Sequence, residues 1–177
     1  MKALWLLFWD LCRLRRGPEE VPYSLPLLAV VVALDVALNL TGHVLAAPDA
    51  LMRGVQLTLM GLLLEMLVLA SLLRFKGLQE RFVQSFTAII GVDLLLSVLA
   101  LSFTLLSLAV EPKSPVIGLV VIAQMLIVGW NLALRGFIYH RALNIGLLQG
   151  IMLSLALFLL NIFLSVQLFP GLLQKNG

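Results

Sequence analysis

The chain has 177 residues, of which 62% are hydrophobic and only 12% charged, with a formal net charge of +3 at neutral pH. This composition excludes a soluble globular domain, in which about a quarter of the residues are charged, and it excludes disorder because apolar residues are in excess. A membrane-spanning helix needs about 20 apolar residues, so the length leaves room for about four to six spans and no soluble catalytic domain. We therefore expect an all-α, polytopic membrane helix bundle.

The N-terminal 16 residues have the spacing of an amphipathic helix. The apolar residues that recur at helical intervals are Leu4, Leu7, Phe8, Leu11 and Leu14, whereas the charged residues lie on another side. Trp5 and Trp9 would then lie at the level of the lipid headgroups. We predict a helix in the plane of the membrane interface, followed by a linker, in a cytoplasmic-face segment that covers residues 1–23. The alternative is an ordinary frayed N-terminus.

Five apolar segments follow, and prolines, glycines or charged residues separate them. They cover about Ser24–Ala47, Leu51–Leu73, Phe82–Val110, Val116–Leu134 and Asn144–Phe169. The fourth is expected to continue as helix through Tyr139. The third is longer than a bilayer requires, so it should tilt or break, with Gly91 the favoured place. Because the loops are short, neighbouring spans should be antiparallel. The spans form one domain, 24–169, and a short external tail follows at 170–177.

Lysine and arginine lie mostly on one side of the predicted bundle. That side holds nine of them: Lys2, Arg13, Arg15, Arg16, Arg74, Lys76, Arg81, Arg135 and Arg141. The other side holds three: Arg53, Lys113 and Lys175. The positive-inside rule then predicts a cytoplasmic N-terminus and, after five spans, an external C-terminus. Because these charges fall at the ends of apolar segments and form no groove-binding patch, we interpret them as topology anchors and predict no nucleic-acid partner.

Three carboxylates lie inside the predicted spans, each near the middle of its own helix: Asp35, Glu65 and Asp93. A charge at that depth costs about 2.5–3.5 kcal/mol on insertion scales, so three of them in so hydrophobic a chain indicate a role. Since Arg135 is placed at the cytoplasmic edge, the acids are expected to have no basic partner at matching depth. We therefore expect at least one acid to be protonated and to donate a hydrogen bond.

Each acid shares a helix face with small and polar residues, and such faces let membrane helices approach closely and form hydrogen bonds. The other polar residues on the faces of the five spans include Asn39, Gln124, Asn131 and Asn161. Three interpretations stay open for this set. They are packing residues held neutral between helices, a docking surface for another membrane subunit, or a relay for protons or cations.

Sequence motifs of catalysis are missing: there is no P-loop, no nucleophile elbow, no C-x-x-C and no H-E-x-x-H. His43 and His140 fall on opposite sides of the predicted bilayer, so they should not share a metal or a catalytic triad. Tyr139 is interpreted as an interfacial anchor and Trp130 as a packing aromatic residue. We predict that the protein is not an enzyme and has no catalytic, cofactor-binding or metal site.

Two stretches of the chain carry a resemblance to a known family. They are the run RFVQSFTAIIGVD, Arg81–Asp93, at the entry to the third span, and Trp130 in the fourth span, followed by Ala142 and Leu143 after a basic loop. Together they resemble the Yip-domain (Ypt-interacting-protein) family of small five-span proteins, particularly its bacterial members. The resemblance covers about Ser24–Phe169 and rests on loose patterning.

Membership of that family would imply a cytosolic N-terminus and a bacterial inner membrane, with the C-terminus in the periplasm. Eukaryotic members are linked to Rab-type GTPases and vesicle traffic; because only 23 residues precede the first span here, that role is not carried over. In size and style the chain is also similar to a small accessory membrane subunit of Rnf-type ion-translocating electron-transfer complexes.

The function that we favour from the sequence is a non-enzymatic accessory subunit of a larger bacterial inner-membrane complex, for which the Rnf-type complex is the candidate. Its partners would be the lipid bilayer and other integral membrane subunits, docked against the polar helix faces. Two alternatives are a small transporter or ion and proton conduit that uses the intramembrane carboxylates, and a Yip-like protein that interacts with lipid and shapes the membrane.

Overall fold

The computed structural model describes residues 2–46, 51–111 and 113–168, and these residues form helices and the turns between them, with no strand. The elements in chain order are α1 (Lys2–Cys12), η1 (Pro18–Glu20), α2 (Leu25–Ala46), α3 (Leu51–Phe75), η3 (Gln79–Arg81), α4 (Phe82–Ala109), α5 (Pro115–Leu143) and α6 (Leu147–Leu168). The helices α2 to α6 are each long and apolar enough to cross a membrane. The prediction of an all-α bundle with five helices that are long and apolar enough to span a membrane is therefore confirmed. The predicted tail, 170–177, lies outside the described residues.

Local chemistry explains where the longest helix begins and ends. Helix α5 begins at Pro115, and the side chain of Ser114 accepts a hydrogen bond from the backbone N–H of Val116. It ends at Asn144, which takes the left-handed conformation (φ 50°, ψ 50°) and donates its backbone N–H to the carbonyl of His140. Asparagine tolerates this conformation better than most residues, so the chain turns tightly into α6. The helix thus continues beyond the apolar segment, as expected, and runs four residues past Tyr139 to Leu143.

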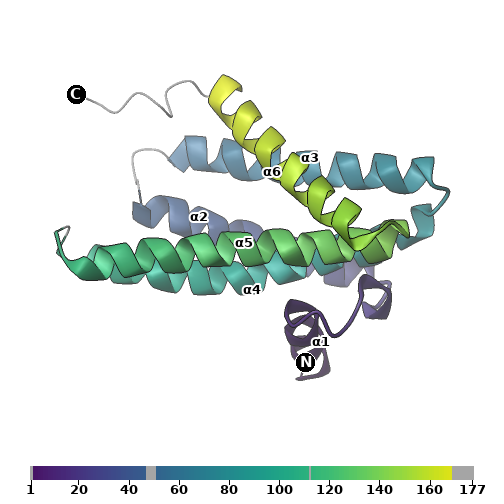
Figure 1. Ribbon diagram of the computed structural model, residues 1–177, viewed down its shortest axis with the longest axis horizontal. Helices are drawn as coiled ribbons and strands as arrows, with labels where there is room; N and C mark the ends of the chain where they lie inside the picture. Colours follow the sequence, from purple (N-terminus) through teal and green to yellow (C-terminus); the bar gives the residue numbers. More distant parts are fainter. Residues whose placement is uncertain (1, 47–50, 112, 169–177) are drawn as a thin grey trace.

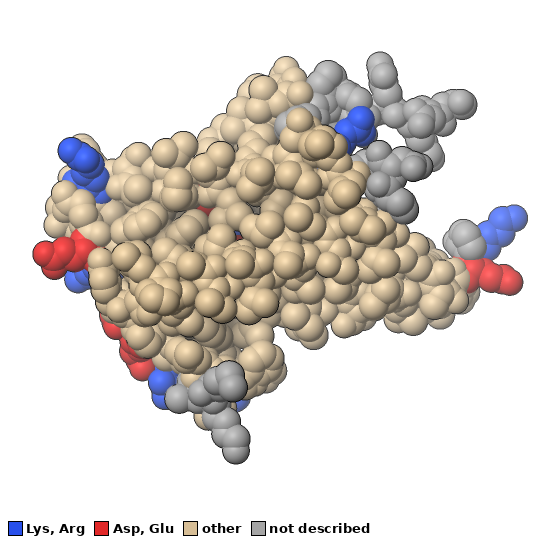
Figure 2. Space-filling model, turned by 180° about the vertical axis from the view of Figure 1, so that it is seen from behind, with Lys and Arg blue, Asp and Glu red and all other residues tan. Residues whose placement is uncertain are grey.

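The helices α2, α4 and α5 lie along the long axis of the bundle, with α3 beside them and α6 crossing obliquely (Figure 1). We call the end where α3 and α5 finish and α4 begins the basic end. Its basic residues include Arg74, Lys76, Arg81 and Arg141. The other end, where α3 and α5 begin, is called the opposite end. On the face seen in Figure 2, charged side chains of the described residues gather at the ends of the molecule, and the surface between them is largely uncharged.

Helix α1 packs across the basic end of the bundle. Leu7, Phe8 and Leu11 are buried, whereas Trp5 and Trp9 on another side are 60% and 49% exposed. Three of the five residues of the predicted apolar face are thus buried, whereas Leu14 lies beyond the helix and is exposed, as is Leu6, so the amphipathic character of the helix stays a prediction. The structure thus contains a helix in this segment, while its position in a membrane interface stays a prediction.

Gly91 has a different role from the expected one. A Cβ atom added to Gly91 would lie 2.1 Å from a ring atom of Phe8, so the missing side chain makes room for α1. Helix α4 continues without interruption from Phe82 to Ala109, and the expectation of a break at Gly91 is wrong. The small residue serves a close contact between two helices rather than a kink.

A second close contact joins α5 to α6. A Cβ atom on Gly150 would lie 2.2 Å from the carbonyl oxygen of Gly136, and one on Gly136 would lie 2.7 Å from the Cα of Ile151. The two backbones therefore touch near the basic end, as small residues allow in membrane helices. From this crossing α6 runs obliquely away from α5 (Figure 1).

The buried apolar core is concentrated in the half of the bundle near the basic end. Its least exposed members there include Leu69, Leu73, Phe86, Ile89, Leu134, Ile138 and Leu143. These side chains come from α3, α4 and α5, and each is at most 4% exposed. These packed side chains separate the cavity in the middle of the bundle, described below, from a surface cavity of about 530 Å³ at the basic end that residues such as Glu19, Arg81 and His140 line.

Candidate functional site

All five long helices contribute to one cavity of about 370 Å³ in the middle of the bundle. Its polar lining residues are Asp35, Asn39, His43, Thr58, Glu65, Asp93, Ser97, Asn131, Arg135 and Asn161. The structure therefore brings together six of the seven polar residues singled out in the sequence. The seventh, Gln124, lies farther toward the opposite end and donates to the hydroxyl of Thr104 at 3.4 Å.

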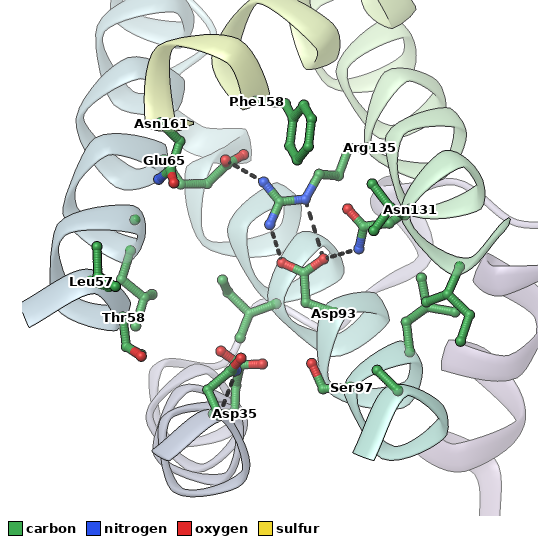
Figure 3. A pocket seen from close by; sticks show the side chains of 18 of the residues that line it. Asp35, Leu57, Thr58, Glu65, Asp93, Ser97, Asn131, Arg135, Phe158 and Asn161 are labelled. Atoms are coloured by element: carbon green, nitrogen blue, oxygen red, sulfur yellow. Dashed lines mark hydrogen bonds and ion pairs between the residues drawn. The ribbon is translucent and has the colours of Figure 1, made fainter. Parts of the chain in front are cut away.

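Arg135 joins two of the three acids (Figure 3). Its Nη1 donates to Oε2 of Glu65 at 2.6 Å, its Nε donates to Oδ1 of Asp93 at 3.2 Å, and its Nη2 pairs with Oδ2 of Asp93. A guanidinium that bonds a carboxylate through two N–H groups is among the strongest charge pairs in proteins. We call Arg135, Glu65 and Asp93 the arginine cluster.

The expectation that the acids have no basic partner is wrong. Helix α5 continues to Leu143, so Arg135 lies eight residues, or about 12 Å, inside its end and not at its edge. From this position the long side chain of Arg135 reaches the carboxylates of Glu65 and Asp93. Arg135 is accordingly part of the site and not a topology anchor.

Tyr139 and Asn131 complete the hydrogen bonding of the arginine cluster. The hydroxyl of Tyr139 donates to Oε1 of Glu65, and Nδ2 of Asn131 donates to Oδ1 of Asp93 at 2.6 Å. Tyr139 is fully buried, so its interpretation as an interfacial anchor is wrong. Asn131, Arg135 and Tyr139 are spaced by four residues, which places them on one face of α5. This spacing is the sequence signal that would have revealed the role of Tyr139.

Asp35 lies across the cavity from the arginine cluster (Figure 3). Its residue is only 5% exposed, and its Oδ1 atom accepts no hydrogen bond from any described residue. The nearby amide of Asn39 donates to the backbone carbonyl of Asp35 at 2.9 Å, as a local helix contact. A buried carboxylate oxygen without a donor is costly, because the group has lost water and gained nothing in return.

The charges in the cavity do not balance within the described side chains that line it. Arginine stays protonated in proteins, so Arg135 supplies one positive charge against the carboxyl groups of Glu65, Asp93 and Asp35. Away from water, uncompensated carboxylates bind protons or recruit a cation. The arrangement is therefore chemically suited to hold positive charge. The prediction that at least one acid is protonated stays a prediction.

The polar space extends from the middle of the bundle toward the opposite end. A second cavity, of about 210 Å³, shares four lining residues with the first and continues past them to Thr104. The shared residues are Asn39, His43, Ser97 and Ala100. Toward the basic end, the packed apolar core closes the space. In the view of Figure 2, charged atoms in the middle of the molecule are visible only at the bottom of a recess.

The C-terminal end of α1 lies close to Asp93 of the arginine cluster. Nε1 of Trp130 donates to the backbone carbonyl of Cys12 at 3.1 Å, which ties α1 to α5. Burial, followed by the nearby carboxylate of Asp93, raises the pKa of the Cys12 thiol to about 11. The thiol is thus protonated at neutral pH. Trp130 itself is half exposed, so it connects two helices rather than filling the core.

The other predicted anchors lie at the basic end, where several fasten the chain to itself. Arg81 donates to the carbonyls of Arg141 and Ala142 and to the side chain of Asn144, and Arg141 forms an ion pair with Glu19 at 2.8 Å. The remaining predicted anchors are Arg13, Arg15, Arg16, Arg74 and Lys76, all of them exposed. Their orientation toward the cytoplasm stays a prediction.

The two histidines lie apart, as expected. His43 lines the cavity near the end of α2, whereas His140 contacts the carbonyl of Ile145 at the basic end. Among the described residues no group of three or more His, Cys, Asp or Glu side chains is arranged to hold a metal ion. Comparisons with models of protein families, with curated proteins and with solved structures found no match. The resemblances to the Yip-domain family and to an Rnf subunit therefore stay predictions.

Proposed function

We propose that this chain is a small membrane protein that binds a cation or a proton in its intramembrane cavity, as a transporter or an ion-coupled protein does. The observation that carries the proposal is that Asp35, Glu65 and Asp93, from three different helices, line the same cavity. Intramembrane acids are costly to insert, and they mark ion and proton sites where they meet at a polar cavity.

The shape of the cavity supports the same proposal. Transport by alternating access requires a site near the middle of the membrane that is open toward one side and closed toward the other. The polar space continues toward the opposite end of the bundle, and the packed core closes it toward the basic end. A continuous relay through the whole bundle would need polar side chains where this core lies.

Flux through purified protein in liposomes tests the proposal. We expect proton or monovalent-cation flux, driven by an imposed potential, that is lost in Asp35→Asn. This variant is the sharpest choice because Asp35 belongs to no ion pair of the arginine cluster. Glu80→Gln, which changes an exposed acid at the basic end, is the matched control. Flux that is equal in wild type, Asp35→Asn, Glu65→Gln and Asp93→Asn would remove the proposal.

One observation favours a second candidate, the accessory subunit. Helices α4 and α5 have 28 and 29 residues, against 22 in α2 and in α6, and α5 extends beyond its neighbours at the opposite end (Figure 1). The exposed apolar residues of α5 toward the opposite end include Leu119, Ile122, Met125 and Leu126. A helix of another bacterial inner-membrane subunit, such as one of an Rnf-type complex, would pack against this face.

Purification in mild detergent after cross-linking tests the second candidate. We expect another membrane protein to be captured through cysteines introduced at Ile122 or Met125, and not through one introduced at Leu63 on α3. The polar docking faces expected from the sequence line the cavity, so a partner would contact the apolar face of α5. If the purified chain stays monomeric, with no cross-linked protein at any of these positions, that result would count against an accessory role.

We further propose that α1 lies in the interface of the cytoplasmic leaflet, with the N-terminus inside and the C-terminus outside. Support comes from the exposed Trp5 and Trp9 and from the basic residues at the same end of the bundle. Deletion of residues 1–16 should weaken liposome binding and membrane shaping by the purified protein if α1 has the Yip-like lipid role. A C-terminal reporter found in the cytosol would overturn the orientation.

A further inference from the structure

We propose that the cavity binds a small organic amine with an apolar body, and that the carboxylate of Asp35 holds its ammonium group. This inference rests on the proposed function and names the class of cation that the cavity fits. Three observations carry it, namely the size of the cavity, the composition of its walls and the unsatisfied oxygen atom of Asp35.

The cavity is larger than a proton or a bare ion requires. Its volume of about 370 Å³ lies in the range of about 300–1,000 Å³ that is typical of small-molecule pockets. A single water molecule takes about 30 Å³ of liquid, so the space is about ten times larger than that. A ligand with several non-hydrogen atoms therefore matches the cavity better than a lone ion does.

The walls combine an apolar surface with a few convergent polar groups. The apolar lining residues include Leu57, Leu62, Ile90, Ile127 and Phe158. Such walls favour a ligand with a hydrocarbon body, because burying apolar surface stabilises binding by about 25 cal/mol per Å². The aromatic ring of Phe158 lies at the edge of the cavity beside Arg135 (Figure 3), where it gives a flat apolar contact.

Asp35 determines the charge of the ligand. Its Oδ1 atom is buried in the cavity lining without a hydrogen-bond donor, and an ammonium group supplies both a donor and the opposite charge. Arg135 meanwhile directs three N–H groups to Glu65 and Asp93, so it is occupied and does not favour an anionic ligand. The free acid and the engaged base together select a cation.

The route of entry follows from the same geometry. Asn39 and His43 line both the main cavity and its extension. The polar wall therefore continues from Asp35 along α2 toward the opposite end of the bundle. The packed core of the basic end blocks the other direction. An amphiphilic amine would therefore enter from the opposite end with its apolar body against the helix walls.

Binding of benzylamine and of benzyl alcohol to the full chain in lipid nanodiscs tests the inference. The two probes have nearly the same shape and differ in charge. We expect benzylamine to bind, detected by saturation-transfer NMR and titration calorimetry, and benzyl alcohol to bind at least tenfold more weakly. Asp35→Asn should lower the affinity for benzylamine at least tenfold, Asp35→Glu should retain most of it, and Glu80→Gln should leave it unchanged.

The possible results separate this inference from the function beneath it. Equal binding of the two probes, or benzylamine binding that is unaffected by Asp35→Asn, overturns the inference. If benzylamine does not bind but liposome flux depends on Asp35, the organic ligand is wrong and the proposed function stands. If neither binding nor flux is found in folded protein, both proposals fail.

Discussion

The acids on the two sides of the central cavity have opposite surroundings. On one side of the cavity, Glu65 is bonded by both Arg135 and Tyr139. On the far side of the cavity, Asp35 is just as buried and has an oxygen atom without a donor. This comparison shows that burial of an acid does not by itself identify a ligand-binding site. A satisfied acid holds the helices together, whereas an unsatisfied acid is available to a ligand.

Among these variants, removal of Arg135 should change the free energy of unfolding most. Arg135→Met leaves Glu65 and Asp93 buried without their cation, so the free energy of unfolding should fall by about 3–5 kcal/mol. Unfolding in mixed micelles measures it. The exposed pair of Arg141 with Glu19 gives the matched control, because Arg141→Met should cost less than about 1 kcal/mol.

A triple variant makes that prediction more stringent. Arg135→Met combined with Glu65→Gln and Asp93→Asn removes the unpaired charges together with the base, so it should recover most of the lost stability. If the single Arg135→Met variant were as stable as wild type, the arginine cluster would not hold α3, α4 and α5 together.

The contact between α5 and α6 should give the next largest effect. In Gly150→Ala the added methyl group would meet the backbone of Gly136, which has no room to move aside, and we expect a loss of about 1–3 kcal/mol of stability. Gly129→Ala is the control on the same pair of helices, since a Cβ there meets nothing within 4 Å. Equal stability of the two variants would contradict the close crossing.

A smaller effect is expected at the hydroxyl group that completes the arginine cluster. Tyr139→Phe removes a hydrogen bond to Glu65, which retains Arg135, so the loss should be about 1.5 kcal/mol. A double-mutant cycle with Glu65→Gln measures the coupling between the two side chains. A coupling energy indistinguishable from zero would show that the hydroxyl group contributes nothing through Glu65.

The smallest effect on stability should come from Asp35. Because its Oδ1 atom has no partner among the described residues, Asp35→Asn should change the free energy of unfolding by less than about 0.5 kcal/mol, or increase it slightly. The same variant should abolish cation flux. A loss of stability comparable to that of Arg135→Met would place Asp35 in the structural framework and end the contrast between the two sides of the cavity.

Much of this fold could be predicted from local properties of the sequence. Hydropathy located the five spans, and helical periodicity placed Asp35, Glu65 and Asp93 on faces that avoid lipid, because each of these signals depends only on neighbouring residues. The pairing of Arg135 was missed because its depth was judged from the end of the apolar run at Leu134, whereas the helix continues to Leu143.

Other features depend on contacts between segments that are distant in sequence. Gly91 suggested a flexible point in a long helix, yet its role appears only when Phe8 of α1 is placed against it. The pairing of Gly136 with Gly150 likewise depends on how α6 folds back along α5. Periodicity within one helix carries no information about which partner that helix meets.

The crossing of α5 and α6 has a mechanical consequence. The two helices touch at Gly136 and Gly150, and farther along α6 the side chains of Phe158 and Asn161 form part of the cavity wall. If α6 rotated about the glycine pair, a small change in its angle to α5 would displace those two side chains more than the contact itself, because they lie farther along α6. A change in the angle between α5 and α6 would therefore alter the cavity wall, although Gly136 and Gly150 are not among the residues that line the cavity.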